Sequence, residues 1–192
     1  MKKKHWNDYL WITSAVYLAL GFFNILFAWI GMLCFCIPLL FALIGGNKTY
    51  CSHYCGRGQL FELLGSKLYF SKGRKTPNWM KHRLFRYLFL LFFLTMFIIM
   101  IWNTYLVAAN ANSLSQIVTL FWSIKLPWNW AYHNEIGGFI AQFSFGFYSV
   151  MLTSTLLGVI TMILYRPRSW CVYCPMGTMT QLICKAKSYH KE

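Results

Sequence analysis

Long apolar stretches with almost no charged residues are the feature that most limits how this chain of 192 residues can fold. They cover residues 9–44, 84–107 and 136–165, and only 11% of all residues are charged. An average soluble domain carries about a quarter charged residues. Because so little polar surface is available, lipid must be the solvent for most of the chain. We therefore expect residues 1–192 to form a single membrane domain of the all-α class.

The first apolar stretch, residues 9–44, is too long for one membrane helix. As a single helix it would reach roughly 54 Å at about 1.5 Å per residue, whereas the hydrocarbon core of a bilayer is about 30 Å thick. We expect two shorter helices joined by a turn between Asn24 and Gly31, with Pro38 inside the second. Together with the other two stretches, the sequence predicts four transmembrane helices arranged as two hairpins.

The basic residues indicate how these hairpins are oriented. Three lysines precede the first apolar stretch, nine Lys or Arg lie between Lys48 and Arg86, and five lie between Arg166 and Lys191. Two hairpins would place all of the 18 basic residues except Lys125 on one side, which the positive-inside rule assigns to the cytoplasm. We expect a multi-pass protein of a prokaryotic inner membrane with both termini cytoplasmic. The charge of +14 then reflects topology and contact with anionic membrane lipid, not binding of nucleic acid.

Residues 108–135, on the opposite side, are polar and aromatic. We expect a short amphipathic helix over residues 113–125. Residues 127–130 (PWNW) are typical of an interfacial loop anchored by tryptophan.

Two similar motifs follow the hairpins, each with a pair of cysteines. The first, KTYCSHYCGRG, runs from Lys48 to Gly58, and the second, RSWCVYCPMG, runs from Arg168 to Gly177. Each contains a basic residue, a hydroxyl residue, an aromatic residue and then the two cysteines. Each also precedes a segment that we expect to be a short interfacial helix, residues 59–68 and 176–183. The chain therefore has the pattern of an internal repeat, with copies over residues 9–70 and 84–187.

The paired cysteines predict a metal centre on the cytoplasmic side. Thiols are kept reduced in the cytoplasm, and cysteines spaced by two or three residues can reach one centre from one turn of chain. Four thiolates are what an iron–sulfur cluster of the 4Fe–4S type requires. The expected ligands are Cys51, Cys55, Cys171 and Cys174.

Glycines and basic residues near the cysteines are consistent with this site. Glycine brings the backbone close to sulfur and permits a positive φ, which would be the role of Gly56, Gly58 and Gly177. The charges that would offset a negative cluster are those of Lys48, Arg57, Arg166 and Arg168. The two helices that follow the cysteine pairs would point N–H groups toward the sulfurs.

Other interpretations of the cysteines remain open. Four thiolates also bind structural zinc, and two dithiols could work with quinone as a thiol oxidoreductase. The four cysteines could also be unligated. Cys34, Cys36 and Cys184 are more typical of packing residues. His53 could hydrogen-bond a sulfur or replace a ligand, although a polar interfacial role is more typical of its position.

The second motif, from Cys171 to Gly177, resembles the Cys-Pro-x-Gly segment of membrane iron–sulfur proteins of the NapH/NosR type, and the first motif resembles its companion. Three features differ from that family. Gly56 stands where the family has proline, the second pair is one residue shorter, and no ferredoxin-like run of four cysteines follows. The resemblance implies membrane electron transfer, often between the quinone pool and a redox enzyme.

We therefore expect an electron-transfer subunit and not a stand-alone enzyme. Its partners would be a cytosolic donor such as a ferredoxin or a flavoprotein, and a membrane carrier such as quinone or a reductase subunit. Arg57, Arg166 and Arg168 would tune the cluster potential or dock an acidic donor. The acidic residues are scattered along the chain, so no catalytic residues are expected.

Overall fold

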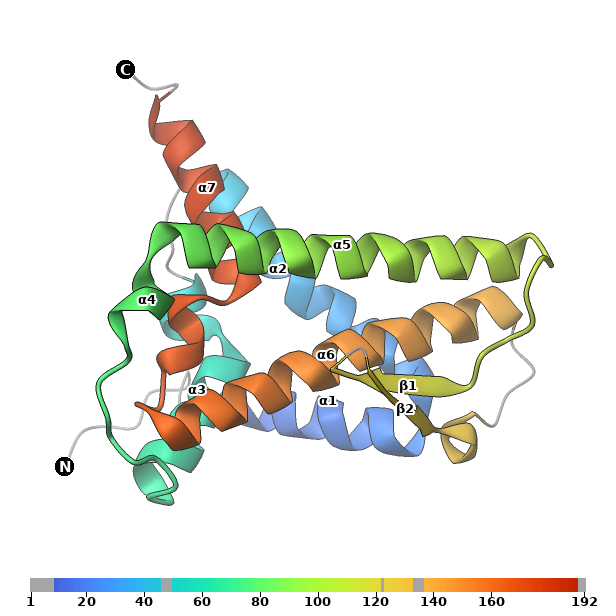
Figure 1. Cartoon of the computed structure of the whole chain (residues 1–192), viewed down its shortest axis with the longest axis horizontal. Helices are drawn as coiled ribbons and strands as arrows, with labels where there is room; N and C mark the ends of the chain where they lie inside the picture. The colour runs from blue at the N-terminus through green and yellow to red at the C-terminus, as the bar shows by residue number, and fades with distance from the viewer. Residues whose placement is uncertain (1–8, 46–49, 122, 133–136, 190–192) are drawn as a thin grey trace. The chain divides into compact units, whose positions relative to one another are not determined.

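The computed structural model describes residues 9–45, 50–121, 123–132 and 137–189, and it is mostly helical (Figure 1). The helices in chain order are α1 (Trp11–Phe23), the 3₁₀ helix η2 (Ile25–Trp29), α2 (Ile30–Gly45), the π-helix η3 (Tyr50–Tyr54), α3 (Gly56–Glu62), the π-helix η4 (Leu63–Lys67), α4 (Asn78–Lys81), α5 (Arg83–Ala108), the 3₁₀ helix η5 (Asn129–Ala131), α6 (Gly138–Leu164), the 3₁₀ helix η6 (Ser169–Val172) and α7 (Pro175–Tyr189). Two strands, β1 (Ile117–Leu120) and β2 (Ile124–Pro127), lie between α5 and η5.

Among the described residues, three helical segments are long and apolar enough to cross a membrane. They are Ile25–Gly45, Arg83–Ala108 and Gly138–Leu164. The first joins η2 to α2, and the other two are α5 and α6, close to the bounds expected from the sequence. Helix α1 is apolar but has 13 residues, which corresponds to roughly 20 Å of helix. The structure therefore supports three candidate spans and a shorter apolar helix.

The break expected in the first apolar stretch is confirmed at Asn24. This residue has extended backbone angles, φ −143° and ψ 117°, and its side chain accepts a hydrogen bond from the N–H of Leu26. An asparagine that bonds the N–H two residues later is a strong helix N-cap, so α1 ends and η2 begins here. Pro38 lies inside α2, and α2 ends at Gly45.

The short helix expected over residues 113–125 is wrong, because this segment forms an antiparallel hairpin of β1 and β2. The structure therefore differs from the expected all-α class by containing this two-stranded sheet. The hairpin is stabilised by α6, whose hydroxyl groups accept hydrogen bonds from an amide of β1 and from the amide of the next residue after the strand. Ser149 accepts from the N–H of Thr119 at 3.0 Å, and Thr153 accepts from that of Phe121 at 3.3 Å. The β-branched residues of β1 also favour an extended backbone.

The chain divides into two compact units, each built from separated segments. We call residues 1–15, 34–92 and 157–192 the cysteine unit, and residues 16–33 and 93–156 the hairpin unit. The hairpin unit has a core of aliphatic and aromatic residues that includes Ile25, Val118, Phe145 and Tyr148. In this core, a Cβ on Gly21 would lie only 2.3 Å from the ring of Tyr148, so glycine is required there.

The cysteine unit has its own core, made of Phe61, Met80, Met162, Trp170 and Tyr173. The ring of Phe61 is fully buried against α6, where a Cβ on Gly158 would approach it to 2.2 Å. This close contact fixes α3 to the end of α6. Both cysteine motifs lie beside this core, so the position of the candidate site depends on its packing.

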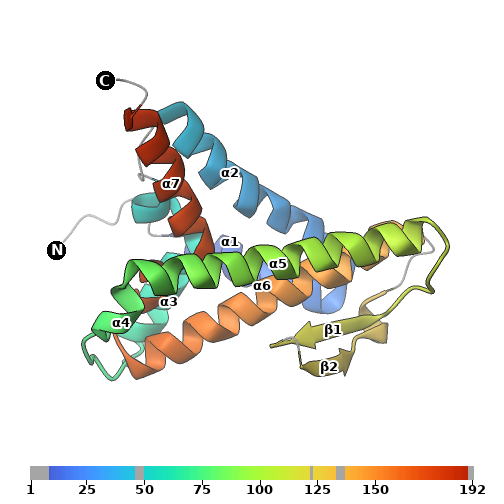
Figure 2. The same ribbon diagram turned by 45° about the horizontal axis from the view of Figure 1, so that its top comes forward.

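The ends of α2 and α7 also meet in the cysteine unit (Figure 2). The ammonium group of Lys187 donates hydrogen bonds to the carbonyl oxygens of Leu43 at 2.7 Å and Ile44 at 2.8 Å. Carbonyls in the last turn of a helix have no partner within the helix, and a cation there is favourable. This contact joins the helix before the first motif to the helix after the second.

Candidate iron–sulfur site

Each cysteine motif places its second cysteine directly before a helix. Cys51 lies in η3, and Cys55 is the N-cap residue of α3, with φ −73° and ψ 102°. Cys171 lies in η6, and Cys174 precedes Pro175, the first residue of α7. Proline is favourable at that position because the first N–H groups of a helix have no intrahelical acceptor. The helices expected after both pairs are confirmed, although α7 is longer than residues 176–183.

One sulfur from each motif lies beside Gly58. A Cβ built on Gly58 would lie 3.5 Å from Sγ of Cys171 and 3.7 Å from Sγ of Cys55. Glycine therefore leaves open a space bordered by one cysteine of each motif. A positive φ plays no part, because Gly73 is the only described glycine with one. The close approach expected of the motif glycines is thus found at Gly58, whereas the expected positive φ is not.

Cys51 contacts the helix that follows the other motif. Its Sγ lies 3.8 Å from Oγ1 of Thr180 in α7, and Thr180 is 1% exposed. The hydroxyl of Thr180 also donates to the carbonyl of Gly177. No local sequence pattern predicts this contact, because 129 positions separate the two residues. It brings a third cysteine to the same end of α7 as Cys174.

The thiols of the two motifs also affect one another electrostatically. Although part of Cys171 is exposed, its pKa is raised to about 12, first by desolvation and then by the thiolates of Cys55, Cys174 and Cys51. Desolvation also raises the pKa of Cys174, to about 11, while N–H groups of Gly177 and Met176 oppose the change. Without a positive centre these thiols stay protonated, so ligation must supply the charge that removes their protons.

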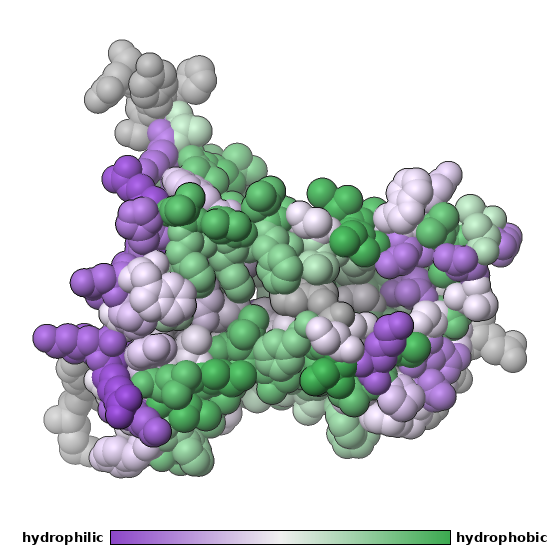
Figure 3. Space-filling view, in the orientation of Figure 1, coloured by the Kyte–Doolittle hydropathy of each residue, from purple (hydrophilic) through white to green (hydrophobic). Residues whose placement is uncertain are grey.

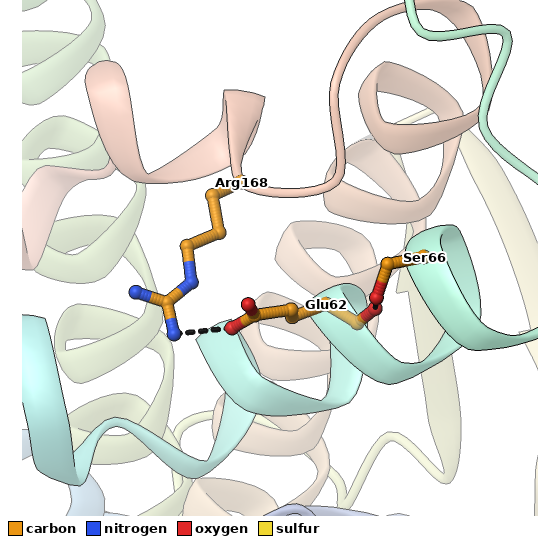
Figure 4. A network of polar contacts seen from close by, with 3 residues as sticks. All are labelled: Glu62, Ser66 and Arg168. Carbon is orange, nitrogen blue, oxygen red and sulfur yellow. Dashed lines mark hydrogen bonds and ion pairs between the residues drawn. The ribbon is translucent and has the colours of Figure 1, made fainter. Parts of the chain in front are cut away.

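Two arginines act on these cysteines. The positive charge of Arg57 lowers the pKa of Cys174, and that of Arg168 lowers the pKa of Cys171, each against the larger effect of desolvation. Arg168 also forms an ion pair with Glu62 of α3, whose backbone carbonyl accepts a hydrogen bond from Ser66 (Figure 4). The ion pair therefore connects the second motif to the helix that begins after the first.

The remaining candidate residues have more limited roles in the structure. Arg166 contacts Ser169 through its backbone, with an N–H to Oγ distance of 3.0 Å. Lys48 lies outside the described residues, and so does the side chain of His53. Cys36 is exposed on α2, and Cys184 is partly buried on α7. The packing role expected for both stays a prediction.

Tyr50, in the first motif, is affected by Cys34 of α2, which the sequence did not predict. Its pKa is raised to about 12, first by desolvation and then by the thiolates of Cys34, Cys55 and Cys51. Cys34 of α2 therefore lies near the first motif, although 17 positions separate it from Cys51. All seven cysteines of the chain are free thiols.

The donor atoms of the candidate site are all thiols. In the described part of the chain, no three His, Cys, Asp or Glu side chains are grouped closely enough to hold a single metal ion. An iron–sulfur cluster uses four cysteine thiolates as ligands. The chemistry of the all-thiol donor set therefore fits a cluster.

Comparison with known proteins agrees with this chemistry. The chain matches the family model described as "4Fe-4S binding domain" over residues 27–77 and 149–188. These two segments contain both cysteine motifs and most of the helices that lead to them. Comparisons with curated proteins and with solved structures gave no match. The family match identifies the cofactor of this chain as an iron–sulfur cluster of the 4Fe–4S type.

Proposed function

We propose that this chain is a membrane electron-transfer protein in which Cys51, Cys55, Cys171 and Cys174 hold one 4Fe–4S cluster. The observation that carries the proposal is the meeting of Cys55 and Cys171 across Gly58, which brings together two motifs far apart in the sequence. The contact between Cys51 and α7, which begins directly after Cys174, supports the assignment of these two cysteines as the remaining ligands. A bound cluster of this type supplies reversible one-electron transfer.

The chain itself would position the sulfurs and set the charge around them. The N–H groups at the start of α7 stabilise negative charge on the sulfur of Cys174. Arg57 and Arg168 bring positive charge, which would favour the reduced state of the site. The ion pair with Glu62 partly offsets Arg168, so this pair would tune the potential.

The membrane arrangement that we propose has the cysteine motifs and both termini on the cytoplasmic side of a prokaryotic inner membrane. The uneven distribution of basic residues along the chain supports this orientation, because the positive-inside rule places basic segments in the cytoplasm. Two hairpins, residues 9–70 and 84–187, would form a single membrane domain with four membrane segments. Because α1 is shorter than the hydrocarbon core, the bilayer would have to thin locally around it. This arrangement also supports assignment to the NapH/NosR type.

The partners that we propose are a cytosolic donor, such as a ferredoxin or a flavoprotein, and a membrane carrier such as quinone or a reductase subunit. Basic residues are concentrated in residues 48–86 and 166–191, and a positive surface favours encounter with an acidic donor. This preference should weaken as ionic strength rises, because salt screens exposed charges.

Anaerobic purification of the full chain in detergent tests the ligand assignment. We expect about four irons and four sulfides per chain, following the composition of a 4Fe–4S cluster, and an electron paramagnetic resonance signal after reduction. Serine at Cys55 or Cys171 should abolish the signal, whereas Cys36→Ser and Cys184→Ser should retain it. Bound zinc without sulfide, or no iron after reconstitution, would refute the proposal. Thiol labelling from outside intact cells would contradict the cytoplasmic orientation.

A further inference from the structure

A small cationic pocket lies in the cysteine unit, between the first turn of α5 and the middle of α7. It encloses about 60 Å³. Since a water molecule needs roughly 10–15 Å³ by this measure, the pocket has room for a group the size of a phosphate. Its polar lining comes from Arg83, Arg86, Tyr87, Thr178, Gln181 and Lys185. None of these residues is a candidate cluster ligand.

Arg86 lines the pocket and is held in place by α7. Its terminal nitrogen donates a hydrogen bond to the side-chain carbonyl of Gln181, which holds the guanidinium beside α7. Its Nε is buried, with no hydrogen-bond acceptor among the described residues. A guanidinium that lines a pocket can bind an anion through charge-assisted hydrogen bonds.

The described chain offers no carboxylate to neutralise the pocket. Glu62 is the only acidic residue within the described ranges, and it pairs with Arg168. Three cations therefore surround the pocket without an acidic partner from the described residues. Guanidinium and ammonium groups in this arrangement match the oxygens of a phosphate.

The surroundings of the pocket favour a lipid as the source of that phosphate. The pocket lies at the start of α5, a candidate membrane span, where lipid head groups would meet the helix under the proposed topology. Trp79, Leu84 and Leu88 expose 58%, 64% and 58% of their surface nearby. Figure 3 shows hydrophilic surface over the start of α5 and over α7, with hydrophobic surface over the next turns of α5. Acyl chains would cover these apolar side chains, whereas free phosphate would not.

We propose that this pocket binds the phosphate of an anionic phospholipid. The lipid phosphate accepts hydrogen bonds from Arg86 and is neutralised by Arg83 and Lys185, while its acyl chains lie along α5. Thr178 lines the pocket and donates a hydrogen bond to the carbonyl of Cys174 at 3.1 Å. The bound lipid therefore contacts the first turns of the helix that carries a cluster ligand at its start. The inference rests on the proposed membrane orientation, but it does not depend on which metal centre the cysteines hold.

Native mass spectrometry of the full cluster-containing chain in a neutral detergent tests this site. Phosphatidylglycerol, phosphatidylcholine and inorganic phosphate are titrated against the unmodified chain, Arg86→Gln/Lys185→Gln and Arg83→Gln/Lys185→Gln. The second double variant keeps the bond between Arg86 and Gln181. The matched control is Arg74→Gln/Lys75→Gln, which removes the same charge from exposed residues outside the pocket.

We expect phosphatidylglycerol to bind the unmodified chain and the control alike, and about tenfold more weakly to both pocket variants. Phosphatidylcholine should bind poorly to all four chains. Equal loss in the control would mean a general charge effect and would overturn the site. Equal binding of phosphatidylcholine, or displacement by inorganic phosphate at equal concentration, would overturn the assignment to an anionic lipid. Iron content is measured in parallel, so failure of the cluster proposal is seen separately.

Discussion

Gly58 offers the sharpest test of the cluster position. Alanine at this position would place its Cβ 3.5 Å from Sγ of Cys171 and 3.7 Å from Sγ of Cys55, which are ordinary van der Waals distances. The cluster-free chain should therefore accept Gly58→Ala. Because Gly58 lies inside α3, alanine should even stabilise that chain by roughly 0.5–1 kcal/mol. The added methyl group nevertheless enters the space that the two sulfurs share.

Valine at position 58 extends the series. Its two γ-methyl groups reach beyond the Cβ, which already lies 3.5 Å and 3.7 Å from the two sulfurs, so we expect valine to crowd them more than alanine does. We expect iron and sulfide content to fall partly in Gly58→Ala and almost completely in Gly58→Val. The cluster-free forms should remain folded by thermal unfolding followed with circular dichroism. Loss of iron without loss of fold is the signature of a blocked site.

Two other glycines serve as controls for the series. A Cβ on Gly45 would meet nothing within 4 Å, so Gly45→Ala should leave iron content and stability unchanged. A Cβ on Gly158 would lie 2.2 Å from the ring of Phe61, so Gly158→Ala should destabilise the fold whether or not a cluster is present. If Gly58→Val retained full iron content and an unchanged paramagnetic spectrum, the space at Gly58 could not be the cluster site.

Three further perturbations test the surroundings of the site. Lys187→Met removes both hydrogen bonds to the last carbonyls of α2, and we expect a loss of roughly 0.5–1.5 kcal/mol in the free energy of unfolding, measured by denaturant titration. In the cluster-free chain, the pKa values of Cys171 and Cys174 are raised from 9.0 to about 12 and about 11, so the folded state holds their protons more tightly than the unfolded state. The thermal stability of the cluster-free chain should therefore be highest below about pH 9 and should fall as the pH rises toward 12. In Cys171→Ser/Cys174→Ser this fall should be less steep. An equally steep fall in both chains would contradict the raised pKa values of the two thiols. Glu62→Gln should change stability by less than about 1 kcal/mol, because its ion pair with Arg168 is half exposed, yet it should raise the cluster potential measured by redox titration.

The sequence predicted those parts of the fold that depend on local patterns. The hydropathy of residues 84–107 and 136–165 located α5 and α6 within a few residues, and the length of the first apolar stretch required the break found at Asn24. Membrane length and helix capping are properties of a contiguous segment, so both can be read without knowing the tertiary structure. The two cysteine pairs were equally visible, because their spacing repeats along the chain.

Features that depend on distant partners could not be predicted in this way. The segment containing β1 is extended because its amides bond to hydroxyl groups of α6, about thirty residues later. An isolated pattern of apolar and polar residues does not reveal such acceptors. The contact between Cys51 and Thr180 is likewise created only when α7 packs against η3. The same limit applies to Cys34, which reaches the first motif through the fold and not through its spacing.

The difference between the two motifs has a physical explanation in the packing of α1. A Cβ on Gly56 would lie 2.5 Å from the carbonyl oxygen of Leu10, so no larger side chain fits there. The corresponding position after the second pair is Pro175, which begins α7 and needs no N–H acceptor. Proline in place of Gly56 would suit the start of α3 but would collide with the backbone of the segment before α1. The glycine in the first motif, where the second motif has proline, therefore follows from the close packing of Leu10 on the start of α3.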